Sequence, residues 1–454
     1  MRDITHILWP RVILTALLIV SAFFHFTDIG KLGAPIFDEM YFATFASNYA
    51  NELPVSDIHP PLGKILYAVP LVLSSCGLPN ISFLTLGYDH AAHRMAADFD
   101  FRPFGSFPYV PLRSVSALFG LLLIVAVYAF TSAVAKNEWA GALAAFLVAF
   151  DNAILVETRA ILLNGMYLSL GLLALALLLK RHALPVLGGI LLGLSLSVKL
   201  IGIVFVGPLI ALVVIHGLTR KEPLIARRTV GRFLLTAGIT FVVLLFLLNN
   251  ITLPTDSRLL LYRELSGAPT STMAGLGTMA TTSPVIKAIG TSLIELDASV
   301  SGYLVGAGAG AGQSAWYTWP FLIKPPFYAA TERGGFIFLD GNPIVWALAV
   351  SGLAFFVLSL RRMRSSETKG IPALMLVSWA TFSLLPFAAF VSRPAYLYHY
   401  FPALIFLVCL FSLLAVEWLS KESFTTRWIA GSILVALVIA GFVALLPFTY
   451  GFPV

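Results

Sequence analysis

The sequence has little charge and almost no cysteine for its length. Of its 454 residues, 11% are charged and two are cysteine, whereas 59% are hydrophobic. A water-soluble globular domain has about a quarter of its residues charged, and a disordered chain is more polar still. The two cysteines provide neither a zinc-binding spacing nor a disulfide framework. The composition therefore excludes a disordered chain, a collagen-like fibre and a disulfide-rich secreted scaffold.

Long apolar runs take up most of the chain, and its mean hydropathy is +0.90. A helix needs roughly 20 apolar residues to cross the hydrocarbon core of a bilayer. Runs near that length occupy residues 7–26, 112–134, 138–156, 160–179, 232–250, 344–360, 371–391, 396–418 and 428–447. The net charge of +7 comes from basic residues between these runs, as in a polytopic membrane protein, and not from one nucleic-acid-binding face.

Residues 184–216 fit either one long helix or two short helices hinged near Lys199 and Gly202. Two helices give eleven spans, with 16 basic and 6 acidic residues on the predicted cytoplasmic side and 13 basic and 16 acidic residues on the other. A single helix would place the basic stretch 220–232 outside, against the positive-inside tendency. We therefore predict an all-α integral membrane protein with about eleven transmembrane helices, a cytoplasmic N-terminus and a C-terminus on the outer side.

Two long segments, residues 27–111 and 251–343, are predicted to face outward. No small-residue cleavage site follows the first apolar run, so we expect that run to be an uncleaved anchor. Within the first outer loop, residues 62–76 are apolar enough to form a helix parallel to the membrane. We predict three regions: an N-terminal membrane module at 1–250, an outer loop at 251–343 and a four-span membrane module at 344–454.

An acidic pair, Asp38-Glu39, follows the first span by about a dozen residues and is expected near the membrane surface. A partly desolvated carboxylate there suits a general base that takes the proton of a hydroxyl, although a solvated acidic loop also explains the pair. Further along the loop, Asp57 and His59 share one face of an extended segment, because a residue before proline is held extended. The prolines explain a helix start but leave Asp57, His59 and Lys64 as candidates for substrate binding.

Basic residues stand at the predicted outer ends of several spans. Ionisable groups at such depth are costly and are functional candidates, and a guanidinium can hold a phosphate with two parallel hydrogen bonds. For each residue alone, snorkelling toward lipid head groups is an equal alternative. Together they predict a phosphate site on the outer side, formed by Arg113, Arg159, Lys199, Arg393 and His399.

Other polar residues near these spans favour structural roles. Asp151, Asn152 and Glu157 crowd the same surface as Arg159, where ion pairing is at least as good an explanation as catalysis. Asn342-Pro343 is typical of a helix start. We see no convincing set of metal ligands and expect no metal cofactor, although four residues of the first loop could together hold a divalent ion: Asp38, Glu39, Asp57 and His59.

Taken as a set, these motifs resemble the protein O-mannosyltransferases, which are membrane glycosyltransferases of the GT-C class. The matching stretches occur in the order of that family. They are Phe-Asp-Glu at 37–39, His-Pro-Pro-Leu-Gly-Lys at 59–64, Asp-Asn to Ile-Leu-Leu at 151–163, Leu-Ser-Leu-Ser-Val-Lys-Leu-Ile-Gly at 194–202, Gly-Asn-Pro at 341–343 and Tyr-His-Tyr-Phe-Pro-Ala at 398–403. Most of these stretches are weak alone, whereas the set is specific.

The resemblance implies an eleven-span GT-C fold and a polyprenyl-phosphate sugar donor, typically carrying mannose. It implies Asp38 as the catalytic base with Glu39 beside it, Arg113 at the lipid phosphate, and Lys199 and His399 as weaker carry-overs. The outer loop 251–343 is too short for the β-trefoil MIR domain of fungal and animal members, so we expect a bacterial or archaeal type. Asn164 stands where the family often has Asp.

We therefore expect an inverting transfer of one sugar to a Ser or Thr hydroxyl of a secreted or membrane protein, at the outer face of the cell membrane. The residues expected to bind the donor sugar or the acceptor are Asp57, His59, Lys64 and Tyr398. Two alternatives remain open. One is a GT-C enzyme that modifies a lipid, such as an aminoarabinose transferase acting on lipid A, and the other is a flippase for lipid-linked sugars. A flippase predicts broken helices near the bilayer midplane with inverted-repeat symmetry.

Overall fold

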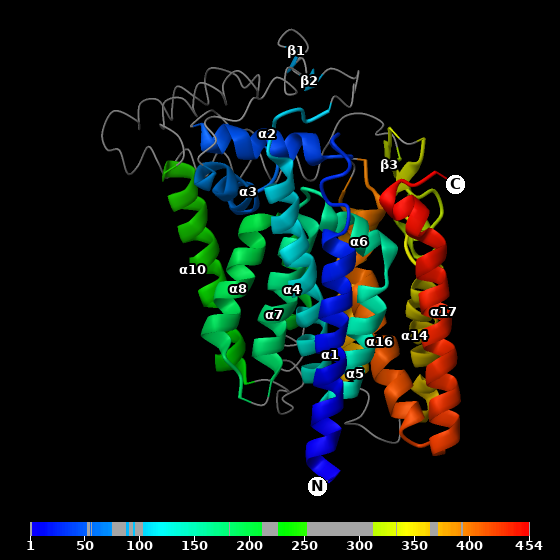
Figure 1. Ribbon diagram of the computed structural model, residues 1–454. Helices are drawn as coiled ribbons and strands as arrows, with labels where there is room; N and C mark the ends of the chain where they lie inside the picture. Colours follow the sequence, from blue (N-terminus) through cyan, green and yellow to red (C-terminus); the bar gives the residue numbers. More distant parts are fainter. Residues whose placement is uncertain are drawn as a thin grey trace.

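The computed structural model describes residues 2–51, 55, 57–74, 88–89, 94–95, 103–180, 182–210, 226–251, 312–332, 334–363, 371–391 and 394–453. Within these ranges the chain forms a bundle of upright helices, with shorter elements gathered at one end (Figure 1). The first and last residues lie at opposite ends of the bundle (Figure 1).

The bundle is built from helices of very different length. Over the described residues, six helices are long and apolar enough to cross a bilayer, and the bent pair α5 and α6 makes a seventh span if counted together. The chain is thus a multi-pass membrane protein, while the number of eleven spans stays a prediction. The helices of the bundle are α1 (Arg2–Phe26), α4 (Tyr109–Ala135), α5 (Glu138–Ala149), α6 (Asn152–Arg159), α7 (Asn164–Leu179), α8 (Pro185–Val198), α10 (Arg227–Ile251), α14 (Pro343–Met363), α15 (Ile371–Ala389), α16 (Phe401–Leu419) and α17 (Phe424–Tyr450).

Each apolar run of the sequence coincides with one or two helices. The ambiguous run 184–216 is split at Lys199 into α8 and the 3₁₀ helix η2 (Leu200–Phe205), as two short helices require. The run 138–156 forms two helices, because α5 and α6 meet at a bend of 69°, so a single span there would be a broken one. Asp151 causes this break: its Oδ1 accepts the Ile154 N–H at 3.0 Å and so starts a new helix.

The cap of the bundle contains helices that lie across its end. α2 (Glu39–Ala50) and α3 (Leu62–Leu73) run transverse to α1 and α4 (Figure 1). α3 matches the expected membrane-parallel helix, and its outer residues Val72 and Leu73 are 68% and 77% exposed, as a helix lying in the interface requires. α2 is a second transverse helix of the first outer loop, where we expected membrane-parallel helices, although we predicted no bounds for it. The sequence did not predict the two short antiparallel hairpins, β1 (Tyr88–Asp89) with β2 (Arg94–Met95) and β3 (Phe327–Ala330) with β4 (Phe336–Phe338).

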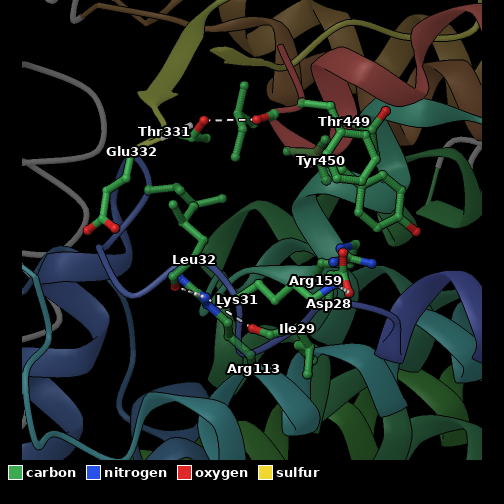
Figure 2. A pocket seen from close by; sticks show the side chains of 15 residues that line it. Asp28, Ile29, Lys31, Leu32, Arg113, Arg159, Thr331, Glu332, Thr449 and Tyr450 are labelled. Carbon is green, nitrogen blue, oxygen red and sulfur yellow. Dashed lines mark hydrogen bonds and ion pairs between the residues drawn. The ribbon is translucent and has the colours of Figure 1, made fainter. Parts of the chain in front are cut away.

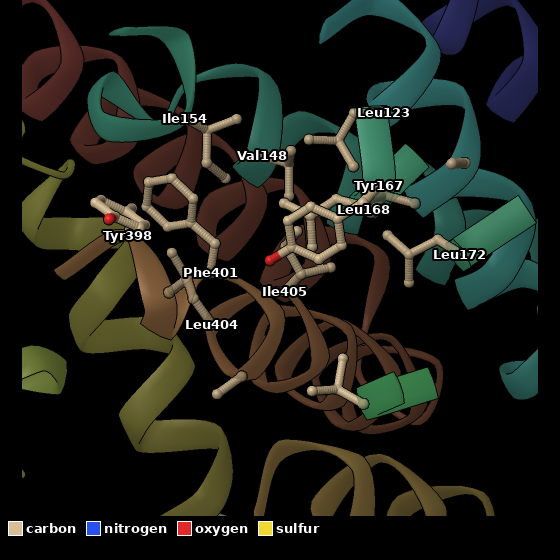
Figure 3. Packing of buried hydrophobic residues seen from close by; sticks show 14 of the residues in the cluster. Leu123, Val148, Ile154, Tyr167, Leu168, Leu172, Tyr398, Phe401, Leu404 and Ile405 are labelled. Carbon is tan, nitrogen blue, oxygen red and sulfur yellow. The ribbon is translucent and has the colours of Figure 1, made fainter. Parts of the chain in front are cut away.

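The core lies around α16, and the outermost helices face lipid. In α16 67% of the span is buried, whereas in α17 only 11% is. Figure 3 shows Phe401 of α16 facing Ile154 of α6, and Ile405 of α16 beside Tyr167 of α7, within one buried cluster. Close approach also fixes the short helices, because a Cβ on Gly171 of α7 would lie 2.1 Å from the Phe205 ring of η2. These contacts position the break at which Lys199 stands.

Asn342 connects α14 to the break between α5 and α6. Its Oδ1 accepts the Ile344 N–H at 3.0 Å, and α14 begins at Pro343, which confirms the predicted helix start. Its Nδ2 donates to the carbonyl oxygens of Phe150 at 2.9 Å and Val438 at 2.8 Å. One amide therefore ties the end of α5 to α14 and α17.

Asp151 completes this junction from the other side. Its Oδ2 accepts the Asn342 backbone N–H at 3.1 Å and the Trp346 indole N–H at 2.8 Å. The next residue, Asn152, donates from Nδ2 to Thr449 Oγ1 at 2.9 Å. All of these side chains are buried. Asp151 and Asn152 thus serve structure by joining the N-terminal and C-terminal parts of the bundle.

We expect Asn342→Ala to lower the free energy of unfolding by about 2–4 kcal/mol, because it leaves buried carbonyl groups and the first N–H of α14 without partners. Thermal denaturation of the detergent-solubilised protein measures the change. Ser351→Ala, at an exposed position of the same helix, is the matched control and should melt as the wild type does. Equal melting of all three proteins would show that this junction contributes little.

Candidate active site

Asp38 lies at the N-terminal end of α2, where the hairpin β3–β4 reaches the first loop. Phe37 before it has a φ of 47°, in the left-handed region that is costly for a residue with a Cβ. The Phe37 N–H donates to the Tyr328 carbonyl oxygen at 3.1 Å, and the two rings stack with centroids 4.4 Å apart. The hairpin therefore fixes the turn that presents Asp38. The Asp38 carboxylate is half-buried and does not cap α2.

Glu39 points into the protein and is fully buried. Its Oε1 accepts from Arg113 Nε and from the Ile161 N–H, both at 2.8 Å. Its Oε2 accepts from Arg113 Nη2 at 2.7 Å and from the Ile36 N–H at 2.9 Å. A carboxylate is tolerated away from water only with such a set of partners. Glu39 thus fixes the start of α2 onto α4 and the segment before α7.

All N–H groups of the Arg113 guanidinium donate to Glu39 or to nearby carbonyl oxygens. Beyond Glu39 it donates to the carbonyl oxygens of Ile29 at 3.1 Å, Leu32 at 2.7 Å and Ala34 at 3.0 Å, of which the first two bonds are drawn in Figure 2. An arginine has five N–H donors, and all five are taken. In this structure the Arg113 donors and the Glu39 oxygens are thus engaged with protein groups, while the phosphate role of Arg113 and the catalytic role of Glu39 stay predictions. The two residues form a clamp behind Asp38.

Arg159 lies in the wall of a surface cavity next to the end of α1 (Figure 2). It donates to the carbonyl oxygens of Phe24 and, at 2.7 Å, Thr27, and its guanidinium lies 4.1 Å from the Tyr450 ring centroid. These carbonyls end α1, where a helix leaves its acceptors without partners. Arg159 thus caps the end of α1, and its role as a phosphate ligand stays a prediction. Other charged residues of the cavity are Asp28, Lys31, Arg113 and Glu332.

Lys199 stands apart from that cavity, so the expected single group of cations is divided in two. It is buried at the break between α8 and η2, and its Nζ donates to Asn164 Oδ1 at 2.9 Å. The same Nζ lies 5.1 Å from the ring centroid of Tyr398 and 5.9 Å from that of Tyr167. Its ammonium is therefore oriented by one amide and two aromatic rings.

Tyr398 connects Lys199 to the loop of Asp38. It belongs to the 3₁₀ helix η4 (Leu397–Tyr400), and its ring centroid lies 5.9 Å from that of Phe37 and 4.3 Å from that of His399. His399 is buried, and its Nδ1 accepts a backbone N–H at the start of η4. The structure thus brings Lys199, Tyr398 and His399 together beside Phe37, as the sequence predicted for one part of the site.

The charge of Asp38 acts on two phenols around it. Burial, together with the Asp38 carboxylate, raises the pKa of Tyr41 to about 12. Burial and the nearby carboxylates of Glu157 and Asp38 raise the pKa of Tyr328 well above its ordinary value. Both phenols are therefore neutral at physiological pH.

Lys64 joins the second half of the first loop to α3. Its Nζ donates to Asp57 Oδ2 at 2.9 Å and to the His59 carbonyl oxygen at 2.5 Å, and it lies 5.5 Å from the Phe45 ring centroid. The His59 ring stacks on Phe42 with centroids 6.1 Å apart. The three predicted residues do come together, but as a buried ion pair that fastens the loop. Their contact with a sugar stays a prediction.

Sequence reasoning missed some residues of this site. Tyr328 lies outside every motif, and its hydrogen-bond partner Glu157 is 171 positions away. Asn164 was visible only as a departure from a family pattern. Arg393 lies outside the described residues. Among the residues that the structure describes, no three His, Cys, Asp or Glu side chains form a group that could hold a metal ion.

Comparison with known protein families gives two matches. The family described as dolichyl-phosphate-mannose-protein mannosyltransferase matches residues 13–253. The C-terminal four-TMM region of protein-O-mannosyltransferase matches residues 304–454.

The chain matches a small part of one relative and nearly the whole length of another. Protein O-mannosyltransferase 1 of Drosophila pseudoobscura pseudoobscura is 33% identical over 162 residues, which are 34% of this chain and 16% of that protein. Polyprenol-phosphate-mannose–protein mannosyltransferase of Mycobacterium tuberculosis is 24% identical over 504 residues, which cover 97% of this chain and 88% of that protein. The chain spans only 15% to 25% of the length of the animal and fungal relatives.

Solved structures show the same fold. A protein O-mannosyltransferase complex of S. cerevisiae, bound to its sugar donor, has a TM-score of 0.74 at 15% identity, over 98% of this chain and 91% of that one. ArnT of Cupriavidus metallidurans, bound to undecaprenyl phosphate, has a TM-score of 0.53 at 17% identity, over 96% of this chain and 64% of that one. These likenesses confirm the GT-C fold.

We expect Arg113→Met to lower the free energy of unfolding by about 3–5 kcal/mol, because it leaves the Glu39 carboxylate buried without its partner. Adding Glu39→Leu should recover part of that loss, since the double variant buries no charge. Chemical denaturation in detergent measures both. Lys421→Met, which removes an exposed pair with Glu417, should change nothing measurable. Additive losses in the double variant would contradict the clamp.

Proposed function

This chain belongs to the dolichyl-phosphate-mannose-protein mannosyltransferase family, and we propose that it moves mannose from a polyprenyl-phosphate donor to a Ser or Thr hydroxyl of a protein. The observation that carries the proposal is the family match over residues 13–253, the part that holds both Asp38 and Lys199. The mycobacterial relative, similar along nearly the whole chain, is named for polyprenol-phosphate-mannose as donor.

In this proposal Asp38 is the general base. It takes the proton of the acceptor hydroxyl as the oxygen attacks C1 of the mannose. The attack comes from the face of C1 opposite to the phosphate, so the configuration at C1 inverts. The bond between C1 and the phosphate oxygen breaks, and its electron pair leaves with the phosphate. The hydroxyl proton ends on Asp38. The hydrogen bonds of Glu39 and the stacking of Phe37 on Tyr328 support this role, because they hold Asp38 from both sides.

Lys199 and His399 are proposed to hold the departing phosphate. Fixed positive groups act most where charge grows in the transition state, and in a site away from water they act strongly. The contact of Lys199 with Tyr398 supports this assignment, since it places the ammonium beside the loop of Asp38. Arg393 stays a further candidate for the phosphate. We propose that these groups act without a metal cofactor.

The reaction is proposed to take place at the outer face of the cell membrane. The charge bias of the loops supports a cytoplasmic N-terminus and a C-terminus outside. The position of α2, α3 and the C-terminus at the same end of the bundle is consistent with this orientation (Figure 1). The acceptor is then a secreted or membrane protein. Asp57, His59 and Lys64 remain candidates for binding the donor sugar or the acceptor.

A lipid acceptor is the second candidate, which the sequence left open; the structure of ArnT with undecaprenyl phosphate shares this fold and concerns the carrier lipid, so it favours neither acceptor. The two candidates use the same donor chemistry and differ only in where the sugar ends. A transfer assay that offers both acceptors therefore separates them.

We expect purified protein in liposomes to move labelled mannose from polyprenyl phosphate to a peptide rich in Ser and Thr. Asp38→Asn should lower the turnover about 10²- to 10⁴-fold, because the general base is lost, while the donor still binds. Radiolabel counting of separated peptide and lipid fractions measures transfer.

Asp28→Asn is the matched control, because Asp28 is an acid of the same loop that lines the separate cavity of Arg159. It should keep wild-type turnover. Label found only in lipid would overturn the protein acceptor, and undiminished turnover of Asp38→Asn would overturn the mechanism. Donor that crosses the membrane intact, with no transfer, would favour a flippase.

A further inference from the structure

Glu157 is a buried carboxylate to which the mechanism above gives no task. It lies in α6 with 1% of its surface exposed. Its Oε1 accepts the Tyr328 hydroxyl, and its Oε2 accepts Asn164 Nδ2 at 2.8 Å. A carboxylate at such a position is costly unless it is needed. Its two oxygens hold two different segments, and each segment leads to one side of the proposed active site.

The branch through Oε2 leads to the cation. Asn164 donates to Glu157 from its amide nitrogen and accepts from Lys199 Nζ at 2.9 Å with its amide oxygen. Turning the amide over would break both hydrogen bonds, so its orientation is fixed. The neutral amide keeps the carboxylate one residue away from the ammonium. Glu157 thereby balances the charge of Lys199 within a buried site without forming a direct ion pair that would compete with a phosphate.

The branch through Oε1 leads to the base. Tyr328 is anchored to Glu157 by its hydroxyl, while its ring and its carbonyl oxygen hold Phe37. Phe37 has the left-handed backbone conformation that precedes Asp38. A residue at a costly φ keeps it only where the surroundings fix it. The hydrogen bond from the Tyr328 hydroxyl to Glu157 connects the Tyr328–Phe37 contact to α6 of the bundle.

We propose that Glu157 is a positioning residue that sets the donor-binding cation through Asn164 and the base-presenting turn through Tyr328. This inference rests on the proposed function, because it assigns Lys199 to the donor phosphate and Asp38 to the acceptor hydroxyl. The two branches leave from different oxygens and share no hydrogen bond, although both end in ring contacts with Tyr398. Removing one hydrogen bond at a time therefore tests each branch by itself.

The separation gives a kinetic test. Asn164→Leu should raise the KM for the polyprenyl-phosphate donor about tenfold and leave kcat near that of the wild type, because it removes a hydrogen bond to a charged group. Tyr328→Phe keeps the stacked ring and removes only the hydroxyl, so it should lower kcat about tenfold with an unchanged donor KM. Glu157→Gln should change both parameters.

Direct binding of polyprenyl phosphate gives a second measurement that needs no turnover. Asn164→Leu and Glu157→Gln should weaken this binding about tenfold, whereas Tyr328→Phe should bind as the wild type does. Asn164→Ala gives the same comparison if the bulk of leucine disturbs the packing.

The chain offers a matched pair of control variants. Tyr128 donates its hydroxyl to Glu138 Oε2 at 2.9 Å, which is the same kind of hydrogen bond outside the site. Tyr128→Phe and Glu138→Gln should leave donor KM, kcat and lipid binding unchanged. Size-exclusion chromatography shows whether each variant is folded.

The outcomes distinguish this inference from the function on which it rests. A wild type that transfers mannose, with Asn164→Leu and Tyr328→Phe shifting the same parameter equally, would overturn the inference alone. A wild type that neither binds polyprenyl phosphate nor transfers mannose would overturn the proposed function, and the inference with it. A raised donor KM in Asn164→Leu and a lowered kcat in Tyr328→Phe, with both controls unchanged, support the inference.

Discussion

A charge inside this bundle is kept only where the protein itself supplies the partner. Lipid offers no hydrogen bonds, so every buried ionised group needs an acceptor or donor from another segment. The Glu39–Arg113 clamp is the strongest case, with four hydrogen bonds on the carboxylate and five on the guanidinium. Because these partners come from the first loop, α4 and the segment before α7, the clamp also determines where α2 begins. The position of Asp38 follows from that beginning.

Two neighbouring acids therefore have different tasks. Asp38 and Glu39 are adjacent in the sequence, but they stand at a helix start, where successive side chains point about 100° apart. Glu39 points into the protein, where both carboxylate oxygens accept hydrogen bonds, while Asp38 stays half-buried beside a group of tyrosines. The basic residues divide in the same way. Arg113 donates to Glu39 and to backbone carbonyls, Arg159 donates to backbone carbonyls, and Lys199 turns toward Tyr398 and Asn164.

The sequence predicted the helices well, because a bilayer sets a minimum length that apolar runs must meet. It also assigned Lys199 and His399 to a phosphate site and Tyr398 to a sugar site, and these assignments stay predictions. It could not predict the break at Asp151, since apolar residues continue on both sides and only a side-chain hydrogen bond to Ile154 starts the new helix. It could not assign partners either. The sequence pattern of an arginine at the end of a span is the same whether the side chain caps a helix or binds a ligand. No motif around Tyr328 indicates that its partner is Glu157.

The outermost helix shows how the bilayer itself can act on this arrangement. α17 has 27 residues, about 40 Å of helix, against a hydrocarbon thickness of roughly 30 Å. A span longer than the local hydrocarbon thickness is accommodated by tilting or by local thickening of the bilayer, and with 11% of its span buried α17 meets lipid along most of its length. Its last turn carries Thr449, which accepts a hydrogen bond from Asn152, and Tyr450, whose ring contacts the Arg159 guanidinium. A change in membrane thickness therefore bears on the wall of the cavity at this end of the bundle.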